Sequence, residues 1–561
     1  METRVRVQFE KILASVLKPD LDSNSAPEAS EPSGLCNYEQ LEKWLRVELF
    51  VLGRLFIELF LASARRGLNQ KRGKASGRVR RRQFKGFFGA VTYWREGSHG
   101  HFPLDNLLGI AKGGFSHSVC LLACNLATRM SFAVSAGVFG RFAGWSPDPG
   151  SIENMVLGIG AHAPDYMEQS APLRDADTRQ VLVIEIDGKA PPTATECELK
   201  KRSAKARERN SQIPEKNAGE ASNKGEGSGS RKRCCCQRHR AKAIRHRARK
   251  KKKEAKASKR RHKGKKSKKE KQQSSRNGQK ELEDSKTKNG RSATLVVTYV
   301  LEQGPDGLLH GPKDKRVWAD FGPRVNMMQW AKEEALRRGF DPQSKDIHLV
   351  MDGEKCLREG MRERFPGATI ALDIRHAEEH LHALGKLIYP GSKPEQKSEQ
   401  DSFVENYRAM LYDGEARKMT QELQALVDEA NKQKKKDGRD PNDGEYQSLE
   451  KEIAYFASRL DMMDYGELKK KDLVIASGQV EGAARHLIGE RMDCGGMRWK
   501  VERARLLMHL RCIEINGEWE KFDAWLSQKN YHQLAQGNLV RRTSTKPPPM
   551  PPPEIQIAQA A

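Results

Sequence analysis

The sequence predicts a mixed α/β fold, and its middle portion supplies the observations that lead to this prediction. Five short apolar segments rich in Val, Ile and Leu have the composition of β-strands. Helical patterns separate the third from the fourth and the fourth from the fifth, whereas none is predicted among the first three. Three strands in succession, then alternating helices and strands, is the pattern of a ribonuclease-H-like α/β domain. The segments are 180–187, 293–301, 316–321, 346–352 and 368–373.

Length and composition exclude several classes of protein. The chain has 561 residues, with 101 Lys and Arg against 74 Asp and Glu, and therefore a formal net charge of +27. These values fit neither a collagen-like fibre nor a disulfide-bonded miniprotein. No uninterrupted apolar run of about 18 residues occurs, so we expect no membrane span. The ten cysteines lack a regular spacing, which indicates a reducing compartment, and the N-terminus lacks a secretory pattern.

Most of the excess positive charge lies in one segment. Residues 231–271 contain 23 Lys and Arg against two Glu, which amounts to 23 − 2 = +21. Such a segment repels itself and has few apolar side chains, so we expect it to be disordered in isolation. A polyanion, and nucleic acid in particular, is its expected partner, with Lys250, Lys251, Lys252 and Lys253 as candidate contacts. The alternative is a solvated insertion without a specific partner.

The region before the first apolar strand is predicted to be mainly helical. A long helix is expected at 38–64, a basic cluster at Arg78 to Arg82, and a strand at 84–94. Three short helices with Ser or Pro-Gly at their joints follow between 116 and 166. They suit a helix-turn-helix DNA-binding unit or an ordinary helical bundle equally well.

Changes in composition and periodicity divide the chain into domains. The expected parts are an N-terminal segment and linker (1–37), a mainly helical N-terminal region (38–175), an α/β catalytic domain (176–376 and 472–530), a basic disordered insertion within it (196–291), a helical insertion (377–471) and a proline-rich disordered tail (541–561).

Acidic residues at the strand ends suggest the chemistry. In the expected topology the first and fourth strands are neighbours, so Asp187 and Asp352 should meet at one edge of the sheet. A third acid, Glu481, lies between Gly478 and Gly482, which allow a close backbone approach. Three oxygen ligands of this kind suit two Mg²⁺ ions that act in a phosphoryl displacement. The alternative is that each Asp-Gly pair is merely a turn or helix cap.

The chain resembles insertion-sequence transposases of the Kra group, which belong to the DDE superfamily together with the Mutator-like enzymes. The resemblance extends over about 181–520. Its most specific part is the last segment, where a Glu-Gly pair is followed by Arg-Met and Gly-Met-Arg-Trp. The matching segments are VLVIEIDGK, HLVMDGEKCLRE, TIALDIRHAEEHLHALG and SGQVEGAARHLIGERMDCGGMRWKVERARLLMHLR.

This resemblance implies a catalytic triad of Asp187, Asp352 and Glu481 that binds two Mg²⁺ ions, for which Mn²⁺ can substitute. Asp373 and His376 match an Asp-x-x-His that supports the site in Mutator-like relatives. Asp373 competes with Asp352 for the role of second acid, and the strand count favours Asp352. The resemblance further implies a bacterial cytoplasmic, nucleoid-associated protein. Its partners would be DNA, as element ends and target, and at least one further copy of the chain.

Four side chains that follow the third acid in the sequence are candidate DNA contacts. Arg485, Arg491 and Arg498 are placed to meet phosphates, and Trp499 can stack on a flipped base. The alternative for Trp499 is packing of the C-terminal helix against the sheet.

Two other functions compete with transposition. His376, Glu379 and His380 match the H-x-x-E-H motif of a zinc metallopeptidase, although an obvious third ligand is absent. A nucleic-acid-binding protein without catalytic activity would need only the basic segment and the helix-turn-helix. In that case Asp187 and Asp352 would have no chemical role.

Overall fold

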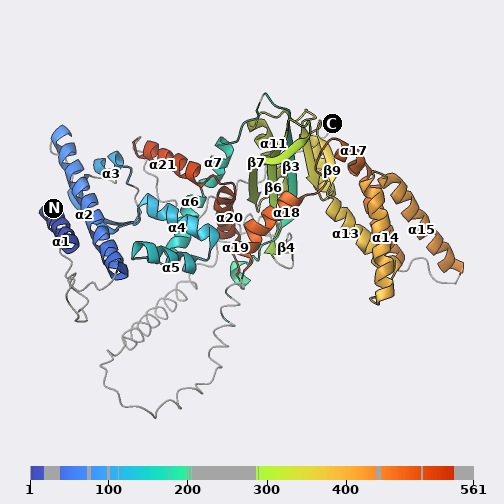
Figure 1. The fold of residues 1–561 in the computed structure, drawn as a ribbon, viewed down its shortest axis with the longest axis horizontal. Helices are drawn as coiled ribbons and strands as arrows, with labels where there is room; N and C mark the ends of the chain where they lie inside the picture. Colours follow the sequence, from blue (N-terminus) through green and yellow to red (C-terminus); the bar gives the residue numbers. More distant parts are fainter. Residues whose placement is uncertain are drawn as a thin grey trace, which may run out of the picture. The chain divides into compact units, whose positions relative to one another are not determined.

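The structure of the chain is a computed structural model (Figure 1). It separates into one unit of Met1–Thr193 with Ala293–Ala561 and another of Ala194–Ser292. The predictions for 18–37, for the basic segment 231–271 and for the tail 541–561 lie outside the described residues. Among the described helices, none has the length and apolar character needed to cross a membrane. The described residues are 2–17, 38–72, 78–97, 102–110, 113–175, 177–198, 200, 204, 286–287, 290–436, 444–494 and 497–535.

A five-stranded mixed sheet forms the centre of the larger unit, which confirms the mixed α/β class. Its strand order is β7-β6-β3-β8-β9. Strand β6 is antiparallel to both β3 and β7, whereas β3, β8 and β9 run parallel. The first and fourth apolar segments are therefore neighbours, as predicted. The strands are β3 (Gln180–Lys189), β6 (Ala293–Gln303), β7 (Leu309–Asp320), β8 (Ile347–Met351) and β9 (Thr369–Leu372).

The strand β7 is longer than the sequence predicted. Only its second half, near Trp318, is apolar and buried, and this half matches the predicted segment 316–321. The first half is polar and mostly exposed, and it extends the pairing with β6 through two register shifts. An exposed antiparallel ribbon needs no apolar face, so hydropathy alone could not reveal it.

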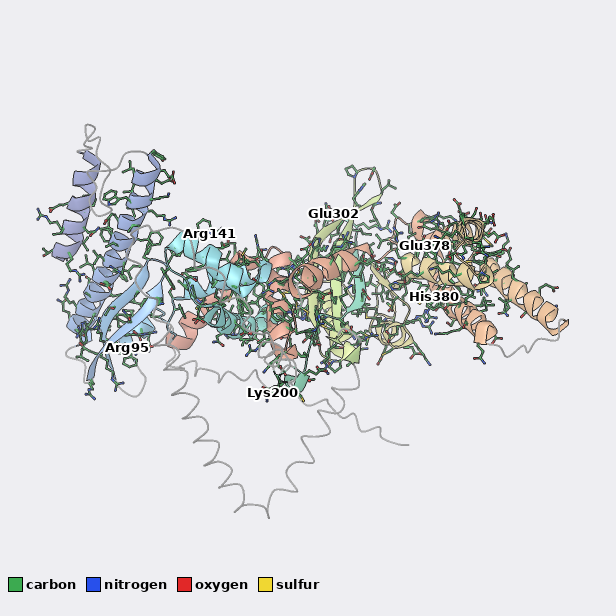
Figure 2. All side chains as sticks on the ribbon, turned by 90° about the horizontal axis from the view of Figure 1, so that it is seen from below. Arg95, Arg141, Lys200, Glu302, Glu378 and His380 are labelled. Atoms are coloured by element: carbon green, nitrogen blue, oxygen red, sulfur yellow. The ribbon has the colours of Figure 1, made fainter. Side chains whose placement is uncertain are left out.

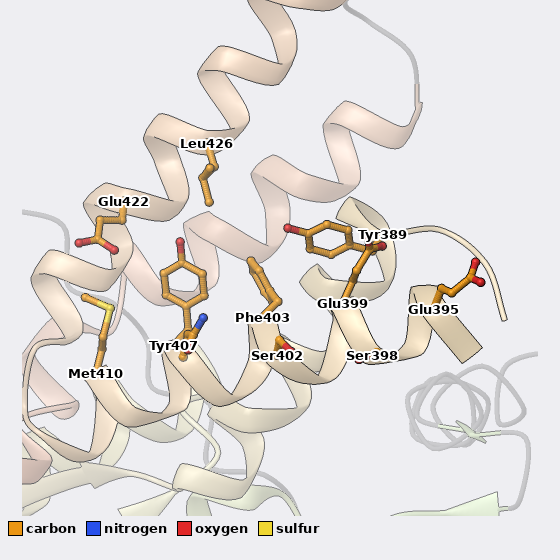
Figure 3. Close-up of a pocket in the computed structure, with 11 residues that line it drawn as sticks. Tyr389, Glu395, Ser398, Glu399, Ser402, Phe403, Tyr407, Met410, Glu422 and Leu426 are labelled. Atoms are coloured by element: carbon orange, nitrogen blue, oxygen red, sulfur yellow. The ribbon is translucent and has the colours of Figure 1, made fainter. Parts of the chain in front are cut away.

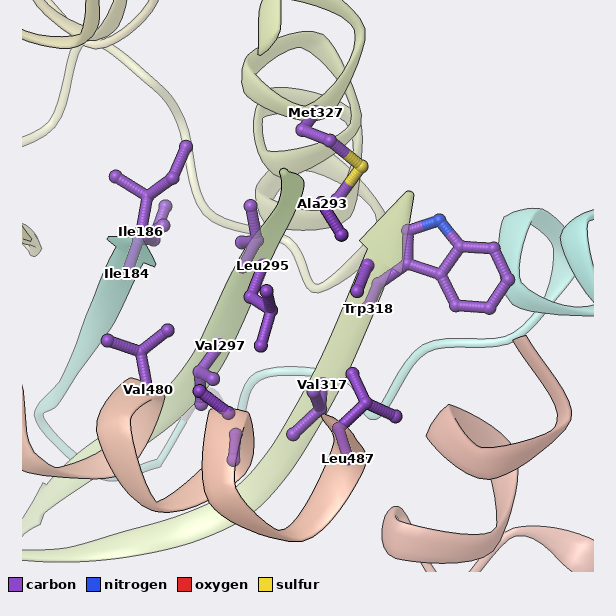
Figure 4. Packing of buried hydrophobic residues seen from close by; sticks show 14 of the residues in the cluster. Ile184, Ile186, Ala293, Leu295, Val297, Val317, Trp318, Met327, Val480 and Leu487 are labelled. Carbon is purple, nitrogen blue, oxygen red and sulfur yellow. The ribbon is translucent and has the colours of Figure 1, made fainter. Parts of the chain in front are cut away.

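Helices cover the sheet and connect its later strands. Helix α11 packs against β6, and helix α18 packs against β3 and β6. Figure 4 shows Val480 and Leu487 on one side of the strands and Met327 of α11 on the other. The helices of this part are α11 (Arg324–Arg337), α12 (Lys355–Arg364), α13 (Ile374–Ile388), α18 (Gly478–Ala484), the π-helical turn η3 (Arg485–Gly489), α19 (Glu490–Met492), α20 (Val501–Ile515) and α21 (Trp519–Ala535).

Helix α20 connects the sheet to the helical region that precedes it. It contacts β7, α4, α6 and α7, and it is buried almost continuously from Leu506 to Ile513. The three predicted short helices are present, and each begins at a side-chain cap formed by Ser116, Ser131 or Asp148. These helices are α4 (His117–Arg129), α5 (Phe132–Ala143) and α6 (Pro149–Gly160), followed by α7 (Ala163–Gln169).

The N-terminal part combines helices with a β-hairpin. The prediction of one strand at 84–94 is wrong, because the chain turns at Phe87 and Phe88 and forms two paired strands. Gly89 follows the turn with a φ of 101°, which favours glycine, and it interrupts the apolar run. The elements are α1 (Glu2–Leu17), α2 (Tyr38–Arg72), β1 (Arg78–Gly86), β2 (Gly89–Gly97) and α3 (Pro103–Leu107).

The predicted helical insertion is helical where the structure describes it. The predicted range 377–471 begins within α13, and the later helices α14 and α16 pack on α13. Its remaining elements are α14 (Pro394–Tyr412), α15 (Ala416–Lys436), α16 (Gly444–Ala457), the 3₁₀ turn η2 (Leu460–Met462) and α17 (Tyr465–Lys470). In the smaller unit, β4 (Lys286–Thr287) pairs with β5 (Gly290–Arg291).

Candidate active site

Asp187 and Asp352 lie together at one edge of the sheet. Ile186 of β3 pairs with Met351 of β8 in parallel register, so the aspartates that follow them are also neighbours. One oxygen of Asp187 accepts a hydrogen bond from the N–H of Gly188 at 2.6 Å. One oxygen of Asp352 accepts from the N–H of Glu354 at 2.9 Å. The turn interpretation is therefore correct for one oxygen of each carboxylate, and among the described residues the second oxygen has no hydrogen-bond donor and can accept a ligand.

The electrostatics of this edge favour a positively charged ligand. Burial raises the pKa of Asp187, and the negative charges of Asp352 and Asp373 raise it further, against the opposing effects of the Gly188 N–H and His376. Two carboxylates held this close repel one another. A bound cation would relieve that repulsion.

Residues of the helical insertion hold the turn that carries Asp352. Gly353 has a φ of 71°, and a Cβ atom there would lie 2.7 Å from Nε of Arg459 and Cδ1 of Leu372. Tyr455 donates its hydroxyl to the carbonyl of Asp352, and Arg459 donates to the carbonyl of Gly353. The insertion thus shapes the site from about 100 residues further along the chain. Its charged pattern in the sequence had no feature that predicted this contact.

Asp373 is the buried centre of a hydrogen-bond network. It caps α13 through the N–H of Arg375, and it also accepts from the N–H and the hydroxyl of Ser477. His376 Nδ1 lies 2.9 Å from its second oxygen. Burial acts to raise the pKa of Asp373, but the hydrogen bonds from His376 and Ser477 prevail and lower it. The same bond raises the pKa of His376 to about 9, with burial opposing, so its ring is positively charged at neutral pH.

This network bears on the choice of second acid. Both oxygens of Asp373 are occupied by donors from the protein, and its side chain is fully buried. Asp352 is partly exposed and keeps one oxygen without a partner among the described residues. The geometry therefore favours Asp352 as the reactive carboxylate and Asp373 as a supporting residue.

Sequence reasoning missed Glu185, which is fully buried on β3. Its carboxylate accepts from the Tyr299 hydroxyl and from the N–H of Val480, each at 2.7 Å. Burial raises its pKa to about 7, and the two hydrogen bonds oppose that shift. A signal was present, because Glu185 interrupts an apolar strand two residues before Asp187 and so shares its face of the sheet.

Glu481 is not brought to the two aspartates by any hydrogen bond or ion pair of the described residues. Its helix α18 is fixed by the bond from Val480 to Glu185, and its buried face carries Ala483 and Ala484. Glu481 is left exposed. Across the described ranges no three His, Cys, Asp or Glu side chains form a group able to hold a metal. Asp187 and Asp352 thus fit as two ligands of a divalent cation, whereas the predicted three-carboxylate set is not assembled.

Two of the predicted DNA contacts are wrong. Arg491 is buried, donates to the carbonyl of Ala127, and has its guanidinium carbon 5.3 Å from the ring centre of Phe132 and 5.2 Å from that of Trp499. Trp499 is also buried, donates its indole N–H to the carbonyl oxygen of Met492 and packs edge-on against the ring of Phe132 in α5. Both side chains consolidate the junction of the helical region with α20.

The other predicted DNA contacts are either exposed or outside the described residues. Arg485 and Arg498 are exposed and remain available to a ligand. Lys250, Lys251, Lys252 and Lys253 lie outside the described residues.

The peptidase motif does not form a zinc site in the part of the chain that the structure describes. His376 is bound to Asp373, whereas His380 is bound to Glu452 and stacks on the ring of Tyr455. Among the described residues no group of three His, Cys, Asp or Glu side chains could hold a metal, so the motif lacks the ligand set that zinc requires. Figure 2 labels His380 beside Glu378 on α13.

A pocket of about 780 Å³ lies between α14 and α15 of the helical insertion (Figure 3). Neither the aspartates at the sheet edge nor Asp373 line it. Its wall combines aromatic rings with acidic side chains, among them Tyr389, Phe403, Tyr407, Glu399 and Glu422.

A scan of the chain against models of known protein families found no match. A search of curated proteins likewise found no match.

Proposed function

We propose that the chain is a DNA transposase of the DDE type, whose sheet domain is ribonuclease-H-like. The observation that carries this proposal is the strand order β7-β6-β3-β8-β9, with an aspartate near the end of β3 and aspartates directly after β8 and β9. In chain order this is 3-2-1-4-5, with strand 2 antiparallel to both neighbours. The resemblance of four segments to Kra-group transposases supports the same function.

The proposed reaction is cleavage of a phosphodiester at the element end, followed by attack of the freed 3′-hydroxyl on target DNA. Asp187 and Asp352 would bind Mg²⁺ or Mn²⁺, which supplies the positive charge that activates water and stabilises the leaving oxygen. His376 would attract the scissile phosphate through its charged ring. Asp373 and Ser477 hold His376 and α18 in place.

The decisive experiment compares Asp352→Asn with Asp373→Asn in a cleavage assay. The substrate is linear DNA that carries the sequences flanking the coding region, incubated with the full chain in Mg²⁺. Asp352→Asn should lower the cleavage rate at least about 100-fold while leaving the thermal midpoint unchanged. Asp373→Asn should lower the thermal midpoint, because a buried acceptor network loses its charge. Asp401→Asn, at an exposed position of α14, is the matched control.

The outcomes separate the alternatives. Full activity of Asp352→Asn would refute the assignment of the reactive carboxylate. Cleavage that persists in a strict chelator would refute the metal. If the wild-type chain binds DNA but never cuts it, the non-catalytic nucleic-acid-binding function replaces the transposase. Glu481→Gln tests the remaining acid, and loss of cleavage there would mean that DNA or metal draws Glu481 to the aspartates.

A further inference from the structure

We infer that the β1–β2 hairpin is a ribbon that binds the major groove of double-stranded DNA. The choice of DNA rests on the proposed function, whereas the surface itself is argued from the hairpin. Strand β1 begins with the sequence RVRRR, and the hairpin as a whole carries six Lys and Arg against one Glu, a net charge of 6 − 1 = +5. Ion pairs with the other described elements neutralise only part of this charge.

Part of this charge is neutralised internally, and part is not. Arg82 and Arg95 both bind the buried carboxylate of Asp105. Arg78, Arg80 and Arg81 are exposed and have no partner among the described residues. Strand alternation places Arg81 on one face of β1, whereas Arg78 and Arg80 lie on the face that carries Phe84. The three guanidinium groups therefore offer positive charge to an anion along both faces of the exposed end of the strand.

One face of the ribbon presents side chains that suit base edges and phosphates. Strand alternation places Arg81, Gln83 and Lys85 on the same side of β1, and all three are exposed. Arg81 is the cross-strand partner of Trp94, whose side chain is 51 % exposed. Arg pairs with guanine and Gln with adenine in the major groove, which admits a two-stranded ribbon.

The ribbon is held rigidly from its other side. Phe84, Val91 and Tyr93 pack with Leu61 of α2 and Leu104 of α3 in a separate apolar cluster. A preorganised ribbon loses less conformational entropy on binding than a mobile loop does. A mostly apolar hollow of about 400 Å³ lies beside Trp94, between β2 and α2, and Arg65 and Asn69 at its wall are bound to Glu96.

The helices predicted as a helix-turn-helix offer less positive charge than the ribbon. Helices α4 and α6 pack on α20, and Arg129 at the end of α4 is bound by Glu514. Helix α5 presents Val134 and Phe142 to solvent, with Arg141 as its one basic residue. Among the described N-terminal elements, the ribbon is thus the stronger candidate for the DNA contact.

The test measures DNA binding by the full chain as a function of salt. The probe is a fluorescein-labelled mixed-sequence duplex of about 30 base pairs, followed by anisotropy from about 50 to 300 mM salt. The triple variant Arg78→Gln/Arg80→Gln/Arg81→Gln should weaken binding at least about 10-fold at 150 mM salt. It should also flatten the plot of log K against log salt by about 3, at about 0.9 for each phosphate that is no longer neutralised.

A second triple variant is the matched control. Lys397→Gln/Arg408→Gln/Arg417→Gln removes the same charge from exposed positions of the helical insertion. It should change binding less than about twofold. An equal loss in both variants would overturn the proposal, because general charge would then explain it. An unchanged affinity of the ribbon variant would also overturn it, and the arginines would then only protect an exposed strand edge.

Two further readouts keep the proposals separate. Circular dichroism should show that the ribbon variant keeps its fold. If the ribbon variant lost affinity only for a single-stranded probe of the same sequence, and kept its affinity for the duplex, groove binding would be refuted. A chain that binds through the ribbon but never cuts DNA would refute the proposed function and leave this inference standing.

Discussion

At the scale of single residues, the best-defined interaction is the network around Asp373. A buried carboxylate with four donors, one of them the positively charged ring of His376, is a rigid support at the edge of the sheet. The charge on His376 depends on Asp373, because the bond between them is the main cause of its raised pKa. The contribution of this pair to stability must therefore depend on pH.

We predict that His376→Ala destabilises the chain at pH 6 and has little effect at pH 10. The folded-state pKa of about 9 exceeds the ordinary value of 6.5. The stabilisation is consequently complete below about pH 6.5 and is lost as the pH rises through about 9. Because a third of the His376 side chain is exposed, we expect a loss of about 1 kcal/mol.

Urea unfolding of the variant and the wild-type chain at pH 6, 8 and 10 measures this difference. His486→Ala, at an exposed position, should change the free energy of unfolding little at any of these pH values. A loss for His376→Ala that is equal at pH 6 and pH 10 would contradict the assigned charge of the ring.

Single residues also show what the sequence reveals about the site. Asp187 and Asp352 were predicted correctly to lie together, because strand-end position follows from hydropathy and neighbouring strands follow from topology. Ser477 was missed, because one hydroxyl in a loop has no distinctive pattern before its partner is known. Glu185 was visible as a charge in an apolar strand, but its partners come from β6 and α18.

At the scale of elements, the contact between α6 and α20 illustrates how tightly the helical region joins the sheet domain. A Cβ atom on Gly160 would lie 2.7 Å from the backbone oxygen of Leu506. Helix α20 also contacts β7, so a displacement there would reach the sheet.

We therefore predict that Gly160→Ala destabilises the chain by about 1–3 kcal/mol, since backbone atoms must move to admit the methyl group. Gly158→Ala on the same helix is the matched control, because a Cβ there meets nothing within 4 Å. That substitution should be neutral or stabilise the helix by up to about 1 kcal/mol. Thermal unfolding measures both variants, and equal midpoints would show that the close approach has no energetic consequence.

Element boundaries were predictable where burial sets them. The strands β3, β8 and β9 lie within about two residues of their predicted ranges, because they are mostly apolar and largely buried. The exposed half of β7 and the turn at Phe87 and Phe88 were not predicted. Strand pairing and backbone geometry, rather than hydropathy, set the boundaries of these elements.

At the scale of the whole molecule, DNA binding should draw on two separate sources of charge. Residues 231–271 carry +21 and lie outside the described residues, whereas the β1–β2 ribbon belongs to the described part. We predict that deletion of 231–271 flattens the salt dependence of DNA affinity and leaves the thermal midpoint unchanged. Filter binding across a salt series measures the first quantity and calorimetry the second. An unchanged salt slope would show that this segment does not contact DNA.

The sequence by itself determined the mixed α/β class, the positions of the buried strands, the pairing of Asp187 with Asp352 at the sheet edge and the location of the charge. These follow from hydropathy period, strand order and residue counting, which are properties read along the chain. The tertiary structure alone decided which polar groups are free. In the tertiary structure both oxygens of Asp373 accept hydrogen bonds, and Arg491 and Trp499 are buried. Glu481 is exposed, and Arg78, Arg80 and Arg81 have no partners among the described residues. Those outcomes depend on contacts between segments distant in sequence, and no local pattern encodes them.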